Sequence, residues 1–61
     1  MDNNTKEFCK GLLNLMEKHG CYLSNIDYNF IVTTAKGEEH VICDGSAYLG
    51  KSDLKEILEE N

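Results

Sequence analysis

Arginine, proline, tryptophan and glutamine are absent from this chain of 61 residues. All six positively charged side chains are therefore lysines, against 11 aspartates and glutamates, and the net charge is −5. Arginine is the side chain that binds phosphates and guanine edges through two parallel hydrogen bonds. An acidic chain without arginine is a poor candidate for direct nucleic-acid binding. Its surface is instead attracted to basic surfaces of other proteins.

Cysteine is scarce, and long hydrophobic runs are absent. Cys9, Cys21 and Cys43 are odd in number and widely spaced, which is not the pattern of a disulfide framework. No apolar stretch approaches the roughly 20 residues that cross a bilayer. The first ten residues are largely polar, where a signal peptide would carry an apolar segment. We therefore expect a cytoplasmic protein with reduced cysteines and no membrane contact.

The motifs of common metal and cofactor sites are also missing. Neither G-x-G-x-x-G nor G-x-x-x-x-G-K-[ST] occurs, so no phosphate-binding loop of these kinds is predicted. His40 and Cys43 lie three apart on an expected strand, where their side chains point to opposite faces and cannot share a zinc ion. The acidic residues within 38–44 do not follow the ligand spacing of a calcium loop. We expect no metal and no cofactor.

A cysteine nucleophile would need a base within hydrogen-bond reach and a cleft. Cys9 and Cys43 are expected in the core, where thiols are usually inert. Cys21 follows the first helix and is the thiol expected to be most reactive. Because a reactive thiol is not by itself a catalytic site, we expect no enzymatic activity and no catalytic residue.

The residues that are present indicate two helices. Apolar residues recur at helical spacing over residues 8–19, between an expected N-cap at Asn4 and the helix-ending Gly20. Gly11 lies inside this helix, where glycine costs roughly 1 kcal/mol, and it indicates close approach of another backbone. Ser52 is the expected N-cap of a short second helix.

Between the helices the pattern changes to that of strands. Residues 26–33 alternate between apolar and polar side chains, and residues 36–37 mark a turn into a second strand. Residues 22–23 or residues 46–49 are candidates for a third strand. The prediction is one α+β domain over residues 1–61. It has a small antiparallel sheet of two or three strands, with an N-terminal and a C-terminal helix, in the chain order α-β-β-(β)-α.

Two registers are open for the predicted hairpin. With a two-residue turn, Val32 faces Val41, and Ile31 lies beside Ile42 on a sheet face that no helix covers. A longer loop with a bulge shifts the pairing by one residue and places His40 beside Val32. The hydrophobic pattern favours the first register, because register follows which face is buried.

The open face, the acidic turns and one tyrosine are the candidate contacts with a partner. Tyrosine is enriched at interfaces because it combines apolar area with a hydroxyl group. Tyr48, beside a glycine-containing loop, is a candidate anchor, whereas Tyr28 is expected in the core. The predicted partner-binding residues are Asp27, Glu38, Glu39, Asp44, Tyr48, Ile31 and Ile42.

The chain resembles small acidic proteins of bacteriophages. The shared features are its length, a Met1 that no targeting signal follows, the order of its predicted elements, and the use of lysine without arginine. Anti-CRISPR and other anti-defence proteins are among these phage proteins. The resemblance implies an inhibitor without chemistry of its own. It would bind and block a larger bacterial protein with a basic surface in the host cytoplasm, such as a CRISPR-Cas component or another nucleic-acid-binding protein.

Two other functions stay open. The first is a small regulatory or accessory homodimer, built through the open face or a sheet edge. Such a dimer would supply the core that one short chain lacks. The second is a sponge for a small ligand such as a nucleotide, with Asn29, Thr33 and His40 as the polar groups of its pocket.

Overall fold

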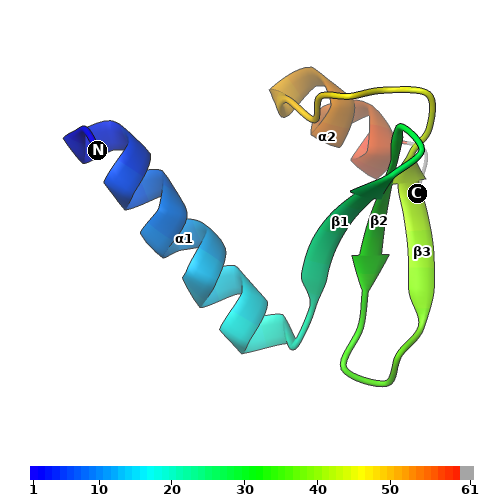
Figure 1. Ribbon diagram of the computed structural model, residues 1–61, viewed down its shortest axis with the longest axis horizontal. Helices are drawn as coiled ribbons and strands as arrows, with labels where there is room; N and C mark the ends of the chain where they lie inside the picture. The colour runs from blue at the N-terminus through cyan, green and yellow to red at the C-terminus, as the bar shows by residue number, and fades with distance from the viewer. Residues whose placement is uncertain (60–61) are drawn as a thin grey trace.

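The computed structural model describes residues 1–59 and has the predicted α+β architecture (Figure 1). Three antiparallel strands form one sheet in the order β1-β2-β3. In the chain, one helix precedes the strands and one follows them. Residues 22–26 supply the third strand, whereas residues 46–49 lie in a loop. The elements are α1 (Asn3–His19), β1 (Tyr22–Ile26), β2 (Asn29–Thr33), β3 (Glu39–Cys43) and α2 (Lys51–Glu59).

Helix α1 begins at an N-cap two residues earlier than predicted. The Asp2 carboxylate accepts hydrogen bonds from the Thr5 backbone N–H (2.8 Å) and the Thr5 hydroxyl (3.0 Å), so the expectation of Asn4 is wrong. These bonds lower the pKa of the Asp2 carboxyl because they stabilise its charged form. At the other end Gly20 is left-handed (φ 65°), and its N–H donates to the Met16 carbonyl oxygen at 2.8 Å, as predicted for a helix-ending glycine.

Helix α2 also begins before its predicted N-cap. Ser52 lies inside the helix, and the Asp53 carboxylate accepts a hydrogen bond from the Gly50 backbone N–H at 2.8 Å. An acidic side chain in the first turn thus reaches back over the helix start, as in a capping box. Asp53 fixes the place where the loop ends and the helix begins.

The turn between β1 and β2 consists of Asp27 and Tyr28, which both have positive φ (53° and 65°). Positive φ at both central residues is the geometry of a type I′ turn, which suits the twist of antiparallel strands. The turn directs the Tyr28 side chain into solvent, where 65% of it is exposed. The expectation that Tyr28 lies in the core is therefore wrong.

Strands β2 and β3 combine the two registers left open by the sequence. Phe30 faces Cys43 in the first register, whereas Val32 faces His40 in the shifted one. The change falls between Phe30 and the next residue of β2, where β3 contributes the additional residue Ile42. One extra residue on one strand is a β-bulge. It bends the strand and changes the sheet face to which the side chains beyond it point.

The bulge overturns one prediction about the sheet faces. Ile31 lies opposite Val41, not beside Ile42. Ile42 instead lines hollows on the side of α1 and α2. Ile31 and Ile42 therefore do not form one open face together.

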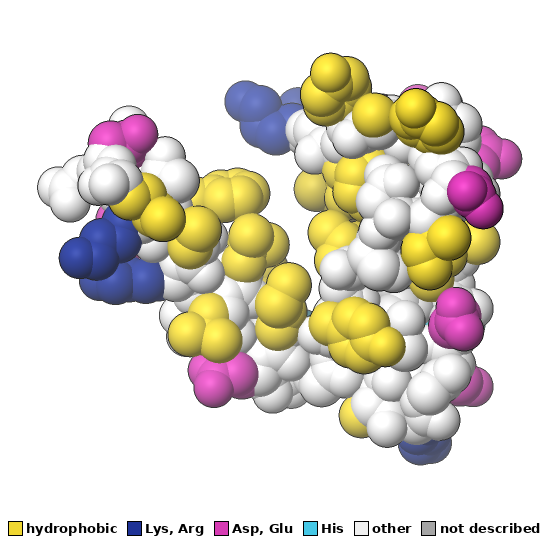
Figure 2. Space-filling view, viewed as in Figure 1, with side chains coloured by type: hydrophobic (Ala, Val, Ile, Leu, Met, Phe, Trp, Pro, Cys, Tyr) yellow, Lys and Arg dark blue, Asp and Glu magenta, His cyan; other side chains and the backbone are white. Residues whose placement is uncertain are grey.

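The described chain has almost no interior. Within residues 1–59, no hydrophobic side chain is buried, and Thr33 is the buried polar residue. Helix α1 diverges from the sheet instead of packing along it (Figure 1). Hydrophobic side chains of α1 and of the sheet with α2 face each other across an open space (Figure 2). No helix in these residues has the length and hydrophobicity needed to cross a membrane.

Candidate functional site

Ser46 donates one hydrogen bond and accepts another at one end of the sheet. Its backbone N–H donates to the Tyr28 carbonyl oxygen at 2.8 Å, and its carbonyl oxygen accepts from the Asn25 side-chain amide at 3.2 Å. The loop after β3 is therefore held against the turn between β1 and β2. We call this part of the molecule the acidic end, defined by the residues Asp27, Asp44, Asp53 and Glu56.

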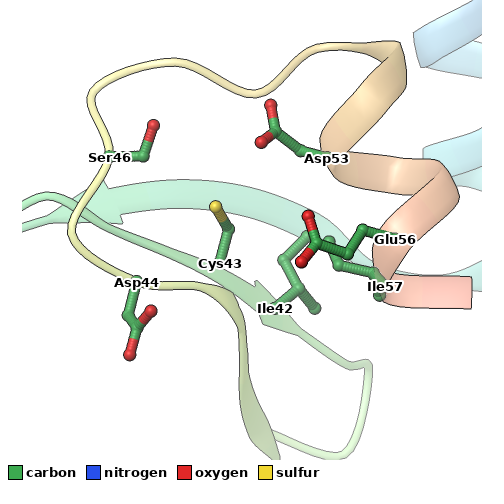
Figure 3. A pocket seen from close by; sticks show the side chains of 7 residues that line it. All are labelled: Ile42, Cys43, Asp44, Ser46, Asp53, Glu56 and Ile57. Atoms are coloured by element: carbon green, nitrogen blue, oxygen red, sulfur yellow. The ribbon is translucent and has the colours of Figure 1, made fainter. Parts of the chain in front are cut away.

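A hollow of about 310 Å³ lies at the acidic end, between the end of β3 and α2. The Cys43 sulfur points into it, between Ser46 and Asp53, whereas the Asp44 carboxylate points away from it (Figure 3). Its lining residues are Ile42, Cys43, Asp44, Ser46, Asp53, Glu56 and Ile57.

The electrostatics of this hollow oppose cysteine chemistry. Partial desolvation raises the pKa of the Cys43 thiol, and the negative charges of Asp53, Asp44 and Glu56 raise it further. A thiol with a raised pKa stays protonated at neutral pH and is a poor nucleophile. The same negative charges disfavour any further negative charge in the hollow, whether a thiolate or a bound anion. Within residues 1–59, no group of three or more histidine, cysteine, aspartate or glutamate side chains is arranged to hold a metal ion.

Two exposed tyrosines flank Ser46. Tyr48 is 82% exposed, and its backbone is fixed because the Ser46 hydroxyl donates to the Tyr48 carbonyl oxygen (2.7 Å) and accepts from the Tyr48 N–H (3.1 Å). Tyr28 lies in the turn that Ser46 binds. From the sequence, Tyr48 was a candidate contact residue and Tyr28 was expected in the core. Asp27 and Asn29, which are residue types common in turns, were the signal that could have placed Tyr28 in a turn.

The structure separates the acidic residues predicted as contacts. Asp27 and Asp44 lie at the acidic end, together with Tyr48. Glu38 and Glu39 lie at the opposite end of the strands, roughly 17 Å away at 3.4 Å per residue over five residues. The sequence missed Asp53 and Glu56, because nothing in it shows that α2 returns to the end of β3.

The three residues suggested for a small-ligand pocket do not converge. Asn29 and Thr33 share one face of β2, since their positions differ by four and side chains alternate between faces along a strand. His40 faces Val32, which lies on the other face of the same strand. The predicted pocket is therefore not formed by these side chains.

The placement of the thiols also differs from expectation. Cys9 is exposed on α1, so the prediction of a core position for it is wrong in the single chain. Cys43 is half-buried, and so is Cys21, whose thiol donates to the His19 carbonyl oxygen at 3.4 Å. All three are free cysteines.

Searches against protein-family models, curated proteins and solved structures found no match to this chain.

Proposed function

We propose that this protein is a non-enzymatic binding protein that covers a basic surface of a larger protein with its acidic end. The observation that carries the proposal is the gathering of four carboxylates and two exposed tyrosines at one end of the sheet. Tyrosine rings supply contact area at low entropic cost. Carboxylates supply attraction and orientation toward positive charge.

The turn that carries Tyr28 supports a binding role for this end. A large side chain at positive φ is held in a sparsely populated conformation, which costs of order 1–3 kcal/mol. Such strain persists where the surrounding structure holds it, and it is concentrated at functional sites. Here the strain places an aromatic ring in solvent beside Asp27, at the acidic end.

The chemistry of the surface indicates the class of partner. A protein that binds nucleic acid has a basic groove for phosphates, and a carboxylate surface competes for the same groove. The resemblance of the chain to small acidic phage proteins supports a bacterial partner of this class, including defence effectors such as CRISPR-Cas components. Covering the groove would inhibit the partner, and no reaction on this chain is required.

Charge-reversal variants at the two ends of the sheet test the proposal. Asp44→Lys with Glu56→Lys changes the charge of the acidic end, and Asp53 is left intact because it caps α2. Glu38→Lys with Glu39→Lys is the matched control, since it changes the net charge equally at the opposite end. Each tagged variant is used to capture proteins from a low-GC bacterial lysate at low and high salt, with identification by mass spectrometry.

We expect the unaltered chain to capture one dominant basic protein, and capture to decrease at high salt because surface charges are screened. The acidic-end variant should lose this protein and the control should retain it. Equal losses in both variants, or capture that persists in the acidic-end variant, would contradict the proposal.

A further inference from the structure

The second hollow in the molecule is an apolar groove of about 380 Å³ between α1, the sheet and α2. Leu12, Leu15 and Met16 line it from α1, Leu23 and Val32 line it from the sheet, and Leu54 lines it from α2. The space between the two hydrophobic surfaces in Figure 2 corresponds to this groove. No carboxylate is among its lining residues in the described part of the chain.

The exposed area of the single chain is larger than that of a typical folded monomer of the same mass. A folded monomer of this mass exposes about 4,000 Å² by the usual scaling with mass, whereas this chain exposes 5280 Å². The excess is about 1,300 Å² per chain, so pairing two chains would bury about 2,600 Å² if it removed the excess from both. That area falls within the range of obligate homodimers, which bury about 2,000 to 5,000 Å².

The length of α1 indicates a second copy and not closure of α1 onto its own sheet. Its 17 residues extend about 26 Å, whereas a five-residue strand extends about 17 Å. The C-terminal end of α1 is joined to β1 through Gly20 and Cys21, so about 9 Å of α1, roughly its first six residues, extends beyond the length of the sheet. Phe8 lies at the edge of this part, about 17 Å from the C-terminal end of α1, and is 67% exposed. The chain's own sheet is too short to cover the whole apolar stripe.

The charge distribution permits self-association despite the net charge of −5. Residues 1–20 are neutral, because Asp2, Glu7 and Glu17 balance Lys6, Lys10 and Lys18. All of the net charge lies beyond residue 20, and the acidic end is outside the groove. Two α1 helices can therefore approach each other without net repulsion.

We propose that a second copy of this chain closes the groove, forming a twofold dimer. The apolar stripe of each α1 packs against α1 and the groove of the other copy, so the same surface serves both chains. Gly11 borders the stripe, and a Cβ added there would meet no atom within 4 Å in the single chain. Its backbone is thus open to close approach by the second α1. This interface is separate from the acidic end.

The unaltered chain tests the proposal directly. Sedimentation velocity at micromolar concentrations should give twice the mass of one chain. Isotope-filtered NMR on a mixture of labelled and unlabelled chains should then show contacts from Phe8 and Leu12 of one chain to Leu23 and Val32 of the other. A single-chain mass, or a dimer without these contacts, would overturn the proposal.

Two substitutions in α1 that change the charge equally supply a matched comparison. Leu15 is 56% exposed in the single chain, and Leu15→Lys should raise the dimer dissociation constant by about 30-fold or more, as for a central interface residue. Glu17→Gln changes the charge by the same amount on the opposite face of α1 and should leave the constant unchanged. Equal effects of both variants would count against this interface. If Leu15→Lys unfolds the chain, the NMR contacts of the unaltered chain decide.

Discussion

The backbone N–H of Ser46 donates to the carbonyl oxygen of Tyr28 at 2.8 Å, which joins the loop after β3 to the turn between β1 and β2. This bond brings an aromatic turn and an acidic loop to the same end of the sheet. It is a backbone interaction, so it does not depend on the side chains that the acidic end presents. Those side chains can therefore be changed one at a time while the loop stays in place.

Replacing the strained turn residue should separate stability from binding. Tyr28→Gly creates an Asp-Gly turn, which accepts positive φ without a side-chain penalty, and should stabilise the protein by about 1 kcal/mol. The same change removes an exposed ring and should weaken capture of the partner. Urea denaturation and partner capture are the two measurements. A destabilised Tyr28→Gly chain would show that the Tyr28 ring contributes to folding.

The second tyrosine should contribute to binding without contributing to stability. Tyr48 is 82% exposed, so Tyr48→Ala should leave the melting temperature nearly unchanged. We expect partner affinity to decrease about tenfold, as for an aromatic interface anchor. Tyr48→Phe, which keeps the ring, is the control for the hydroxyl group. Affinity that is unaffected by Tyr48→Ala would remove this residue from the binding surface.

The carboxylates around Cys43 should slow its alkylation. Partial desolvation and then Asp53, Asp44 and Glu56 raise the pKa of this thiol, so its thiolate forms only at a higher pH than in an ordinary cysteine. In a chain with Cys43 as the single cysteine, the alkylation rate should reach its plateau at a higher pH than that of free cysteine. Glu56→Gln should shift the profile toward lower pH. A profile like that of free cysteine would show that these charges do not act on the thiol.

The cap of α1 should be sensitive to acid. Hydrogen bonds from Thr5 lower the pKa of Asp2, so its stabilising effect is present above the ordinary carboxyl pKa and is lost as pH falls through the lowered value. Asp2→Ala should reduce helicity at neutral pH, measured by circular dichroism. Asp2→Asn keeps a capping oxygen without a titrating group and should remove this part of the acid dependence. Equal helicity in Asp2→Ala and the unaltered chain would mean that the cap contributes nothing.

Gly11 inside α1 and Gly20 just after it should respond oppositely to replacement by alanine. Gly20→Ala places a side chain at φ 65°, with its Cβ 3.1 Å from that of Ala35, and should destabilise the protein by about 1–2 kcal/mol. Gly11→Ala meets no atom of its own chain and should increase the helicity of α1 by its propensity. In the proposed dimer the added Cβ of Gly11→Ala should also weaken self-association. Urea denaturation over a range of protein concentrations measures both effects.

Local features of the chain were predictable because they depend on neighbouring residues. Gly20 ends α1 as expected, since a left-handed residue is needed there and glycine adopts it without penalty. The cap at Asp2 was missed because several polar residues in a row could each have served. The bulge at Ile42 was missed because a strict alternation of apolar residues does not show where one strand carries an extra residue.

By itself the sequence determined the element order, the α+β class, the apolar stripe of α1 and an acidic surface without arginine. These follow from periodicity, turn residues and charge, which are properties of short segments. The tertiary structure alone decided that Tyr28 and Tyr48 share one end with Asp44, and that α1 leaves an apolar groove uncovered. Both depend on contacts between residues far apart in the chain, and on the greater length of α1 compared with the strands that come after it.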